Sequence, residues 1–116
     1  MSESDVVSAE ALSMYYYLDE NKQVKAFPPG TTYEELGKAW ESKDARIVRQ
    51  ETVRPGVWVS TVFLPLDHNF TGEGPPIVFE TMVFRDEHGE ECERCSTWEE
   101  AVAMHERMVA MVRAEE

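Results

Sequence analysis

The sequence has few cysteines, few basic residues and no long hydrophobic run. Its two cysteines, Cys92 and Cys95, are separated by only two residues, and two are too few for the disulfide framework of a small secreted domain. Charged or turn residues interrupt every apolar run before the roughly 20 residues that a membrane-spanning helix needs. The first residues, Met1 to Asp5, are acidic and polar, whereas a secretory signal opens with basic residues. These absences predict a cytoplasmic protein.

The scarcity of basic residues sets the charge. Eleven Lys and Arg stand against 23 Asp and Glu, which leaves a formal net charge of −12. Such a surface repels a phosphate backbone instead of releasing its counterions, so direct binding to nucleic acid is disfavoured. Residues 54–84 hold only Arg54, Asp67, Glu73 and Glu80 as charged side chains. The middle of the chain is therefore predicted to form the core.

The short motifs of several enzyme classes are missing as well. The chain contains no Walker loop, no Gly-rich dinucleotide fingerprint, no G-x-S-x-G elbow and no H-E-x-x-H helix, each of which carries a specific chemistry. We therefore expect no cofactor. A binding function is favoured over catalysis, although an enzyme of another class stays open.

What the sequence does contain fits one folded domain. Its 116 residues are 42% apolar and 10% aromatic, which is enough for one core and too short for two. Residues 1–12 lack clear periodicity and are expected to form a flexible N-terminal tail, followed by a single α+β domain over residues 13–116. A β-hairpin is predicted where tyrosine-rich residues 14–18 and apolar residues 24–27 flank a turn.

Two helices are predicted from capping boxes. Thr31-Thr32 lies three residues before Glu34-Glu35, and this helix is expected to extend to about Ser42. Ser96-Thr97 stands in the same relation to Glu99-Glu100 and opens the last helix. The apolar stripe of the last helix consists of Trp98, Ala101, Val102, His105, Val109 and Val112.

Four strands are predicted between the helices, at residues 45–53, 57–66, 77–84 and 90–95. The resulting order is β-β-α-β-β-β-β-α, an α+β fold with an antiparallel meandering sheet of about four to six strands and two helices. The two central strands are apolar on both faces. We therefore expect one face to be closed by the N-terminal hairpin or by a second subunit of a homodimer.

A histidine and cysteine series has two interpretations. His88, Cys92, Cys95 and His105 form an H-x3-C-x2-C-x9-H pattern of ligand types that zinc accepts. Cysteines at this spacing on one strand would point to opposite faces, however. Only Cys95 lies near a helix N-terminus of the kind that lowers a thiol pKa. Two reduced structural thiols without a metal are the favoured interpretation.

Four polar residues stand in otherwise apolar surroundings: Asp67, His68, Glu80 and His105. If they converge, a histidine beside an orienting carboxylate could act as a general base. A Glu–His pair that satisfies hydrogen bonds inside the core is the commoner case. The hydroxyls that could complete either network are those of Ser60, Thr61 and Thr81.

Three segments together resemble small bacteriophage and prophage proteins found especially in actinobacterial viruses. The segments are Val-Ser-Thr-Val-Phe-Leu-Pro-Leu-Asp-His at 59–68, Phe-Glu-Thr-Met-Val-Phe at 79–84, and Ser-Thr-Trp-Glu-Glu-Ala at 96–101 followed by His105. The resemblance covers roughly residues 14–112 and implies a phage origin rather than an activity. Pro65 stands where that group usually has glycine and Cys95 where it usually has tyrosine, and the latter difference argues against a shared metal or redox site.

The function that these observations favour is that of a small acidic phage-type accessory protein that binds a host or phage protein. One alternative is a nucleic-acid mimic that occupies the basic groove of a host protein. The enzymatic alternative is a small hydrolase or transferase that uses Asp67, His68, Glu80 and His105.

Overall fold

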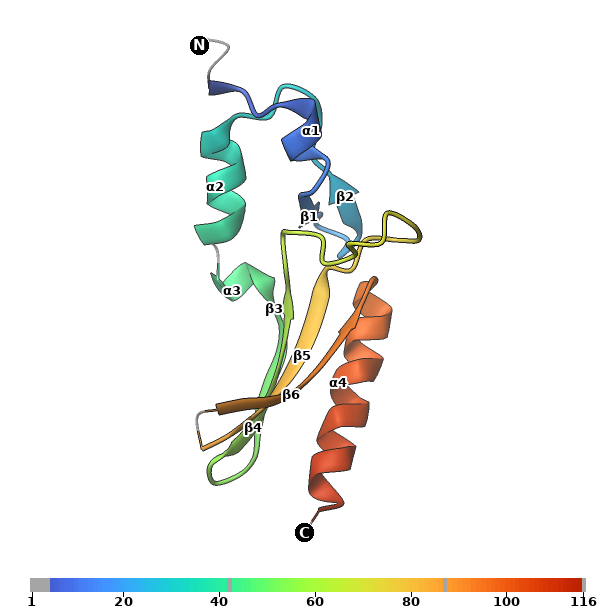
Figure 1. Cartoon of the computed structure of the whole chain (residues 1–116). Helices are drawn as coiled ribbons and strands as arrows, with labels where there is room; N and C mark the ends of the chain where they lie inside the picture. The colour runs from blue at the N-terminus through green and yellow to red at the C-terminus, as the bar shows by residue number, and fades with distance from the viewer. Residues whose placement is uncertain (1–4, 42, 87, 116) are drawn as a thin grey trace.

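The computed structural model describes residues 5–41, 43–86 and 88–115 and confirms the predicted α+β class. A four-stranded sheet is covered by one long helix, and Figure 1 shows a smaller N-terminal part at one end of the sheet. The elements are α1 (Ala9–Leu12), β1 (Tyr16–Leu18), β2 (Val24–Ala26), α2 (Tyr33–Glu41), α3 (Lys43–Arg46), β3 (Ile47–Arg54), β4 (Val57–Phe63), β5 (Phe79–Arg85), β6 (His88–Cys95) and α4 (Trp98–Arg113).

The main sheet is the predicted meander, with the strand order β3-β4-β5-β6 and antiparallel pairing throughout. β4 and β5 pair over their whole length, from Val57 opposite Arg85 to Phe63 opposite Phe79. Two helices were expected, and the two additional ones, α1 and α3, are each only four residues long.

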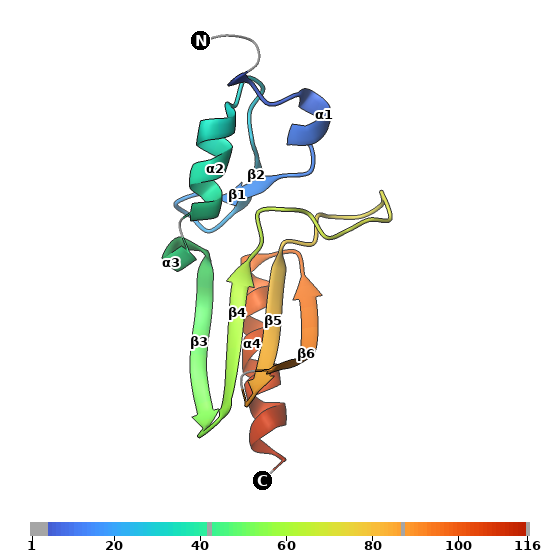
Figure 2. The ribbon, with the colours of Figure 1, turned by 60° about the vertical axis from the view of Figure 1, so that its left-hand side comes forward.

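Helix α4 covers one face of this sheet. Val59 of β4 and Val83 of β5 have no exposed surface, and they form a cluster with Met104, Met108 and Val112 of the helix. The helix begins at the predicted cap, because the side chain of Thr97 accepts a hydrogen bond from the backbone N–H of Glu100. Figure 2 shows α4 behind the sheet.

The hairpin of β1 and β2 has the predicted antiparallel pairing but does not cover the opposite face. Leu18 and Val24 pack against the cluster that contains Phe63 and Phe79, so the hairpin extends the core on the α4 side, at the end of the strands (Figure 1). This end-on stacking gives the molecule principal extents of 57 × 28 × 25 Å. The expectation that the hairpin closes the second face is therefore wrong.

Residues 5–12, which belong to the predicted tail, contact the rest of the chain. Val7 is 3% exposed and Leu12 is 5% exposed, and both pack against Leu36 of α2. Helix α1 is capped by Ser8, whose side chain accepts from the N–H of Ala11. The sequence pattern does not predict α1 because a single helical turn is too short to show periodicity. Residues 1–4 lie outside the described residues.

The predicted capping box of α2 is confirmed. The Thr32 hydroxyl accepts from the Glu35 N–H at 3.2 Å, and the Glu35 carboxylate accepts from the Thr32 N–H at 3.1 Å. Both halves of the box therefore satisfy N–H groups that the first turn of a helix leaves free.

Strand bounds shift where the chain leaves the sheet. The predicted strand 57–66 ends at Phe63, and the carbonyl of Pro65 instead accepts from the N–H of Tyr16 in the hairpin. Proline has no N–H for the ladder, which favours an end to regular pairing near it. The predicted strand 45–53 begins only at Ile47, because α3 precedes it.

In the part of the chain that the structure describes, no helix combines the length and the apolar character needed to cross a membrane.

The cap of α4 offers a test of the fold. Thr97→Ala should lower the free energy of unfolding by about 1 kcal/mol, because the Glu100 N–H loses its acceptor. Thr97→Ser, which keeps the hydroxyl, should stay close to the wild type in urea unfolding. Equal losses in the two variants would contradict the capping role.

Candidate functional site

A buried polar chain links the sheet to α4. Thr61 of β4 and Thr81 of β5 lie directly opposite each other, and their hydroxyl oxygens are 2.5 Å apart. The Thr61 hydroxyl is also 2.7 Å from Nδ1 of His105 on α4. All three side chains are completely buried. Three different elements therefore meet through hydrogen bonds in the middle of an otherwise apolar layer.

The chain continues toward the surface through β3. Nε2 of His105 is 2.9 Å from Oε1 of Glu51, whose side chain is 35% exposed. The other carboxylate oxygen of Glu51 lies 3.5 Å from the guanidinium of Arg113 near the end of α4. Glu51 thus connects the buried histidine to an exposed basic residue.

One assignment of the hydrogens satisfies all of these partners. A carboxylate accepts hydrogen bonds, so in this assignment Nε2 of His105 donates to Glu51 and Nδ1 accepts from the Thr61 hydroxyl. The Thr61 oxygen in turn accepts from Thr81. Every polar atom of the chain has a partner in this assignment, which is how buried polar groups are normally satisfied.

Hydroxyl, imidazole and carboxylate follow the order of a nucleophile, a base and an orienting acid. The exposure does not suit that use, because Thr61 and His105 have no exposed surface and lie between the sheet and α4. A substrate would have to separate the two layers to reach the hydroxyl. The arrangement acts as an internal tie between the helix and three strands.

Glu80 does not join this group, although the sequence analysis placed it with His105. Its neighbour Thr81 points toward α4, so alternation along the strand turns Glu80 to the other face. There its carboxylate accepts from Arg94 Nε at 2.9 Å and from the Cys92 thiol at 3.3 Å. Glu80 and His105 therefore lie on opposite sides of the sheet.

Asp67 and His68 lie in the loop between β4 and β5. Oδ1 of Asp67 accepts from the N–H groups of Asn69 and Ile77, at 2.7 and 2.8 Å. Nδ1 of His68 is 2.7 Å from the carbonyl oxygen of Leu66. These contacts shape the loop. The structure does not bring these four residues together, and of the four only His105 enters the buried chain.

The cysteines face opposite sides of β6, as their spacing predicts. The Cys92 thiol donates a hydrogen bond to Glu80 on the face of the sheet opposite α4, whereas Cys95 packs against the core clusters on the α4 side. Burial raises the pKa of Cys95 to about 11. Desolvation, followed by the hydrogen bond to Glu80, raises the pKa of Cys92. Both shifts keep the thiols protonated at neutral pH.

The candidate zinc series is not assembled by what the structure describes. The side chain of His88 lies outside the described residues, and Cys92, Cys95 and His105 are divided between two faces of the sheet. Within the described residues no group of three or more His, Cys, Asp or Glu side chains is placed to hold a metal ion.

Sequence reasoning missed Glu51 and Arg113. Glu51 is followed two residues later by Val53, which packs on the α4 cluster, so the period of two placed both side chains on the same face. That signal could have identified an inward carboxylate but not its partner, because His105 is 54 residues away.

The face of the sheet opposite α4 is the second candidate site. It is defined here as the open face, and it carries Trp58 and Val62 of β4 and Met82 and Phe84 of β5, all half-buried. The rings of Trp58 and Phe84 stack with centroids 4.3 Å apart and planes 16° apart. Among the described residues, Figure 2 shows no helix or strand in front of this face.

Charge is scarce on the open face. On its two central strands, within the described residues, Glu80 is the one charged side chain, and it is paired with Arg94. A depression of about 270 Å³ at its margin is lined by Arg46, Ile47, Gln50 and Val62. The open face is therefore an apolar, nearly neutral surface on a chain of net charge −12.

The fold defines the class of this chain as an α+β domain with a half-covered antiparallel sheet. Comparison with protein-family models, with curated proteins and with solved structures gives no significant match.

The buried chain can be tested at its centre. Thr61→Val keeps the shape but leaves Nδ1 of His105 without a donor, and this should cost about 1–3 kcal/mol of unfolding free energy. Thr52→Val is the matched control, because Thr52 is exposed on β3, and it should change stability by less than about 0.5 kcal/mol. A similar loss in both variants would show that the hydrogen bonds contribute little.

The raised thiol pKa values predict slow alkylation. At pH 8 only about a thousandth of a thiol with a pKa of about 11 is ionised, so Cys95 should react with iodoacetamide at least about 100-fold more slowly than free cysteine. Peptide mass spectrometry would measure the alkylation rates, with urea-unfolded protein as the control. Equal rates in folded and unfolded protein would contradict the pKa shift.

By linkage, the stability that the neutral Cys95 thiol contributes should be complete below about pH 9 and be lost as the pH rises through about 11.

Proposed function

We propose that this protein is a protein-binding module and that the open face is its contact surface. The observation that carries the proposal is that α4 covers one face of the sheet, while the other bears the half-buried side chains of Trp58, Val62, Met82 and Phe84. Figure 2 shows no helix or strand in front of that face among the described residues. A solvated face of an antiparallel sheet ordinarily shows polar side chains. An apolar one is typical of an interaction site.

The composition of the open face suits a protein partner. Aromatic side chains and methionine are enriched in protein interfaces, and charged side chains are depleted at interface centres. From Trp58 to Val62 the apolar stripe, interrupted on β4 by the buried hydroxyl of Ser60, extends about 13 Å along the strand, at roughly 3.3 Å per residue. A patch of this size fits a transient interface better than an obligate one.

The charge of the chain adds a preference for the partner. With a net charge of −12, the surface around the neutral open face attracts a basic protein at long range and speeds the encounter. Apolar contact would then hold the complex. The resemblance to phage proteins supports a host or phage protein as that partner, and an accessory role in the host cell.

A charge placed in the open face should abolish the interaction. Met82→Lys puts an ammonium group in the middle of the apolar stripe, and we expect at least about a tenfold loss of partner in quantitative affinity capture from host cells. Met111→Lys is the matched control, because Met111 is 41% exposed on α4 and the change in charge is the same.

Both variants would be checked by circular dichroism and thermal unfolding, so that a lost partner is not a lost fold. Capture of the partner by the wild type and Met111→Lys, but not by Met82→Lys, would support the open face. Equal capture by all three proteins would rule out this surface.

A further inference from the structure

One large apolar side chain projects almost fully into solvent. Phe70 is 82% exposed, the highest value among the exposed large hydrophobic residues that the structure describes. It lies in the loop between β4 and β5, which Figure 1 shows extending away from the body of the molecule. Exposing an aromatic ring is unfavourable in water, and a contact that covers the ring would remove this cost.

Hydrogen bonds within the loop hold the backbone on both sides of Phe70. The side-chain amide of Asn69 donates to the carbonyl oxygens of Glu73 and Pro75, at 2.7 and 2.9 Å. Its oxygen accepts from the N–H and hydroxyl of Thr71. Asp67 closes the base of the loop through Ile77. A loop ordered in advance loses less conformational entropy when its tip is bound.

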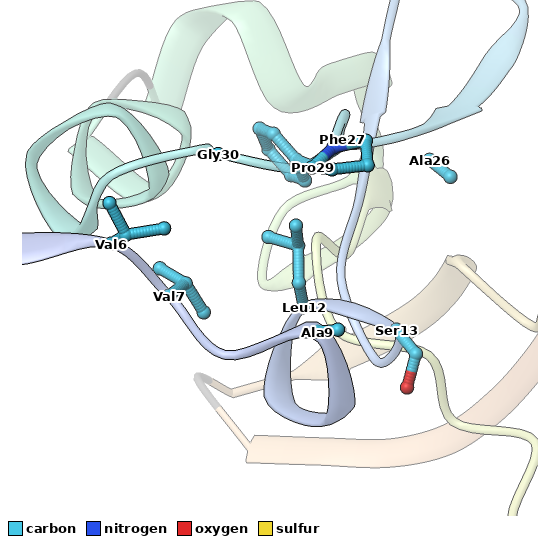
Figure 3. Close-up of a pocket in the computed structure, with 9 residues that line it drawn as sticks. All are labelled: Val6, Val7, Ala9, Leu12, Ser13, Ala26, Phe27, Pro29 and Gly30. Atoms are coloured by element: carbon cyan, nitrogen blue, oxygen red, sulfur yellow. The ribbon is translucent and has the colours of Figure 1, made fainter. Parts of the chain in front are cut away.

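The same chain contains a mostly apolar pocket, which is suited to binding a phenyl ring. A pocket of about 380 Å³ opens between α1, β2 and the segment that leads to α2. Apolar side chains form most of its wall, as Figure 3 shows for Val6, Val7, Leu12, Phe27 and Pro29. A cavity of about 150 Å³ is enough to hold a benzene ring, so a phenyl group fits this pocket with room to spare.

We propose that Phe70 of one copy inserts into this pocket of a second copy, and that the second copy does the same in return. Figures 1 and 2 both place α1 and the Phe70 loop on the same side of the molecule. In the proposed dimer the two reciprocal contacts lie around one two-fold axis, which is the symmetry of an isologous dimer.

The area involved makes this dimer weak. A buried aromatic residue contributes about 150–250 Å², so two rings and the pocket walls that they cover fall at or below the roughly 1,200 Å² of a stable interface. Two chains of charge −12 also repel each other. The dimer should therefore form only at high concentration and should strengthen with salt, which screens the repulsion and leaves the apolar contact intact.

Sedimentation velocity across the micromolar to millimolar range, at low and high salt, tests the proposal. The wild type should shift toward dimer with both concentration and salt. Phe70→Ala should weaken association at least about tenfold, and it should fold normally because the ring is exposed. Met111→Ala, which also shortens an exposed apolar side chain, should associate like the wild type.

A variant of the pocket completes the experiment. Val6→Glu places a carboxylate at the pocket, at a position already 36% exposed, and should also weaken association. A mixture of Phe70→Ala with Val6→Glu retains one intact contact of the two, so it should associate more strongly than either variant alone. A wild type that stays monomeric throughout, or a dimer that persists in Phe70→Ala, would overturn the proposal.

Discussion

The packing of one helix on one face of a four-stranded sheet is the constraint on which the rest of the molecule depends. Helix α4 has 16 residues and is about 24 Å long at 1.5 Å per residue. This matches the seven residues of β4 and β5, which extend about 23 Å at 3.3 Å per residue. The core is therefore filled along the strands on one side, and the described residues contain no second helix of this length for the other.

The buried hydrogen bonds give this packing a defined register. Apolar contacts between α4 and the sheet are tolerant of small shifts, whereas His105 must meet Thr61 and Glu51 at once. A helix displaced by one turn would leave buried polar atoms without partners, which is costly. The carboxylate of Glu51 also reaches Arg113, so the same residue fixes the middle and the end of the helix. The polar chain thus selects one arrangement of an interface that the apolar residues stabilise.

Local chemistry made the elements predictable, and distance in the sequence made the site unpredictable. The caps at Thr32 and Thr97 and the hairpin depend on residues within a few positions, and they were found from the sequence. Glu80 and His105 were grouped because the sequence does not say which alternate residues of β5 face α4. That choice is set by the pairing of β5 with β4 and β6, and it places Glu80 on the face opposite His105. The burial of Val7 depends on Leu36 of α2, which is distant from Val7 in the sequence.

The two proposed surfaces differ in shape, and this difference decides what each can bind. The open face is a broad, nearly neutral sheet surface, while Phe70 projects from a loop and the pocket beside α1 is concave. A projection and a hollow on one chain are complementary to each other, which favours a second copy as their occupant. The open face is flat and has no such counterpart on the described residues, and in our proposal it is the surface that meets a different protein. Because α1 and the loop lie apart from the middle of the sheet in Figure 2, pairing through Phe70 would leave both open faces free. A dimer would then present two binding surfaces, and the second binding event would gain from the high local concentration that the first creates.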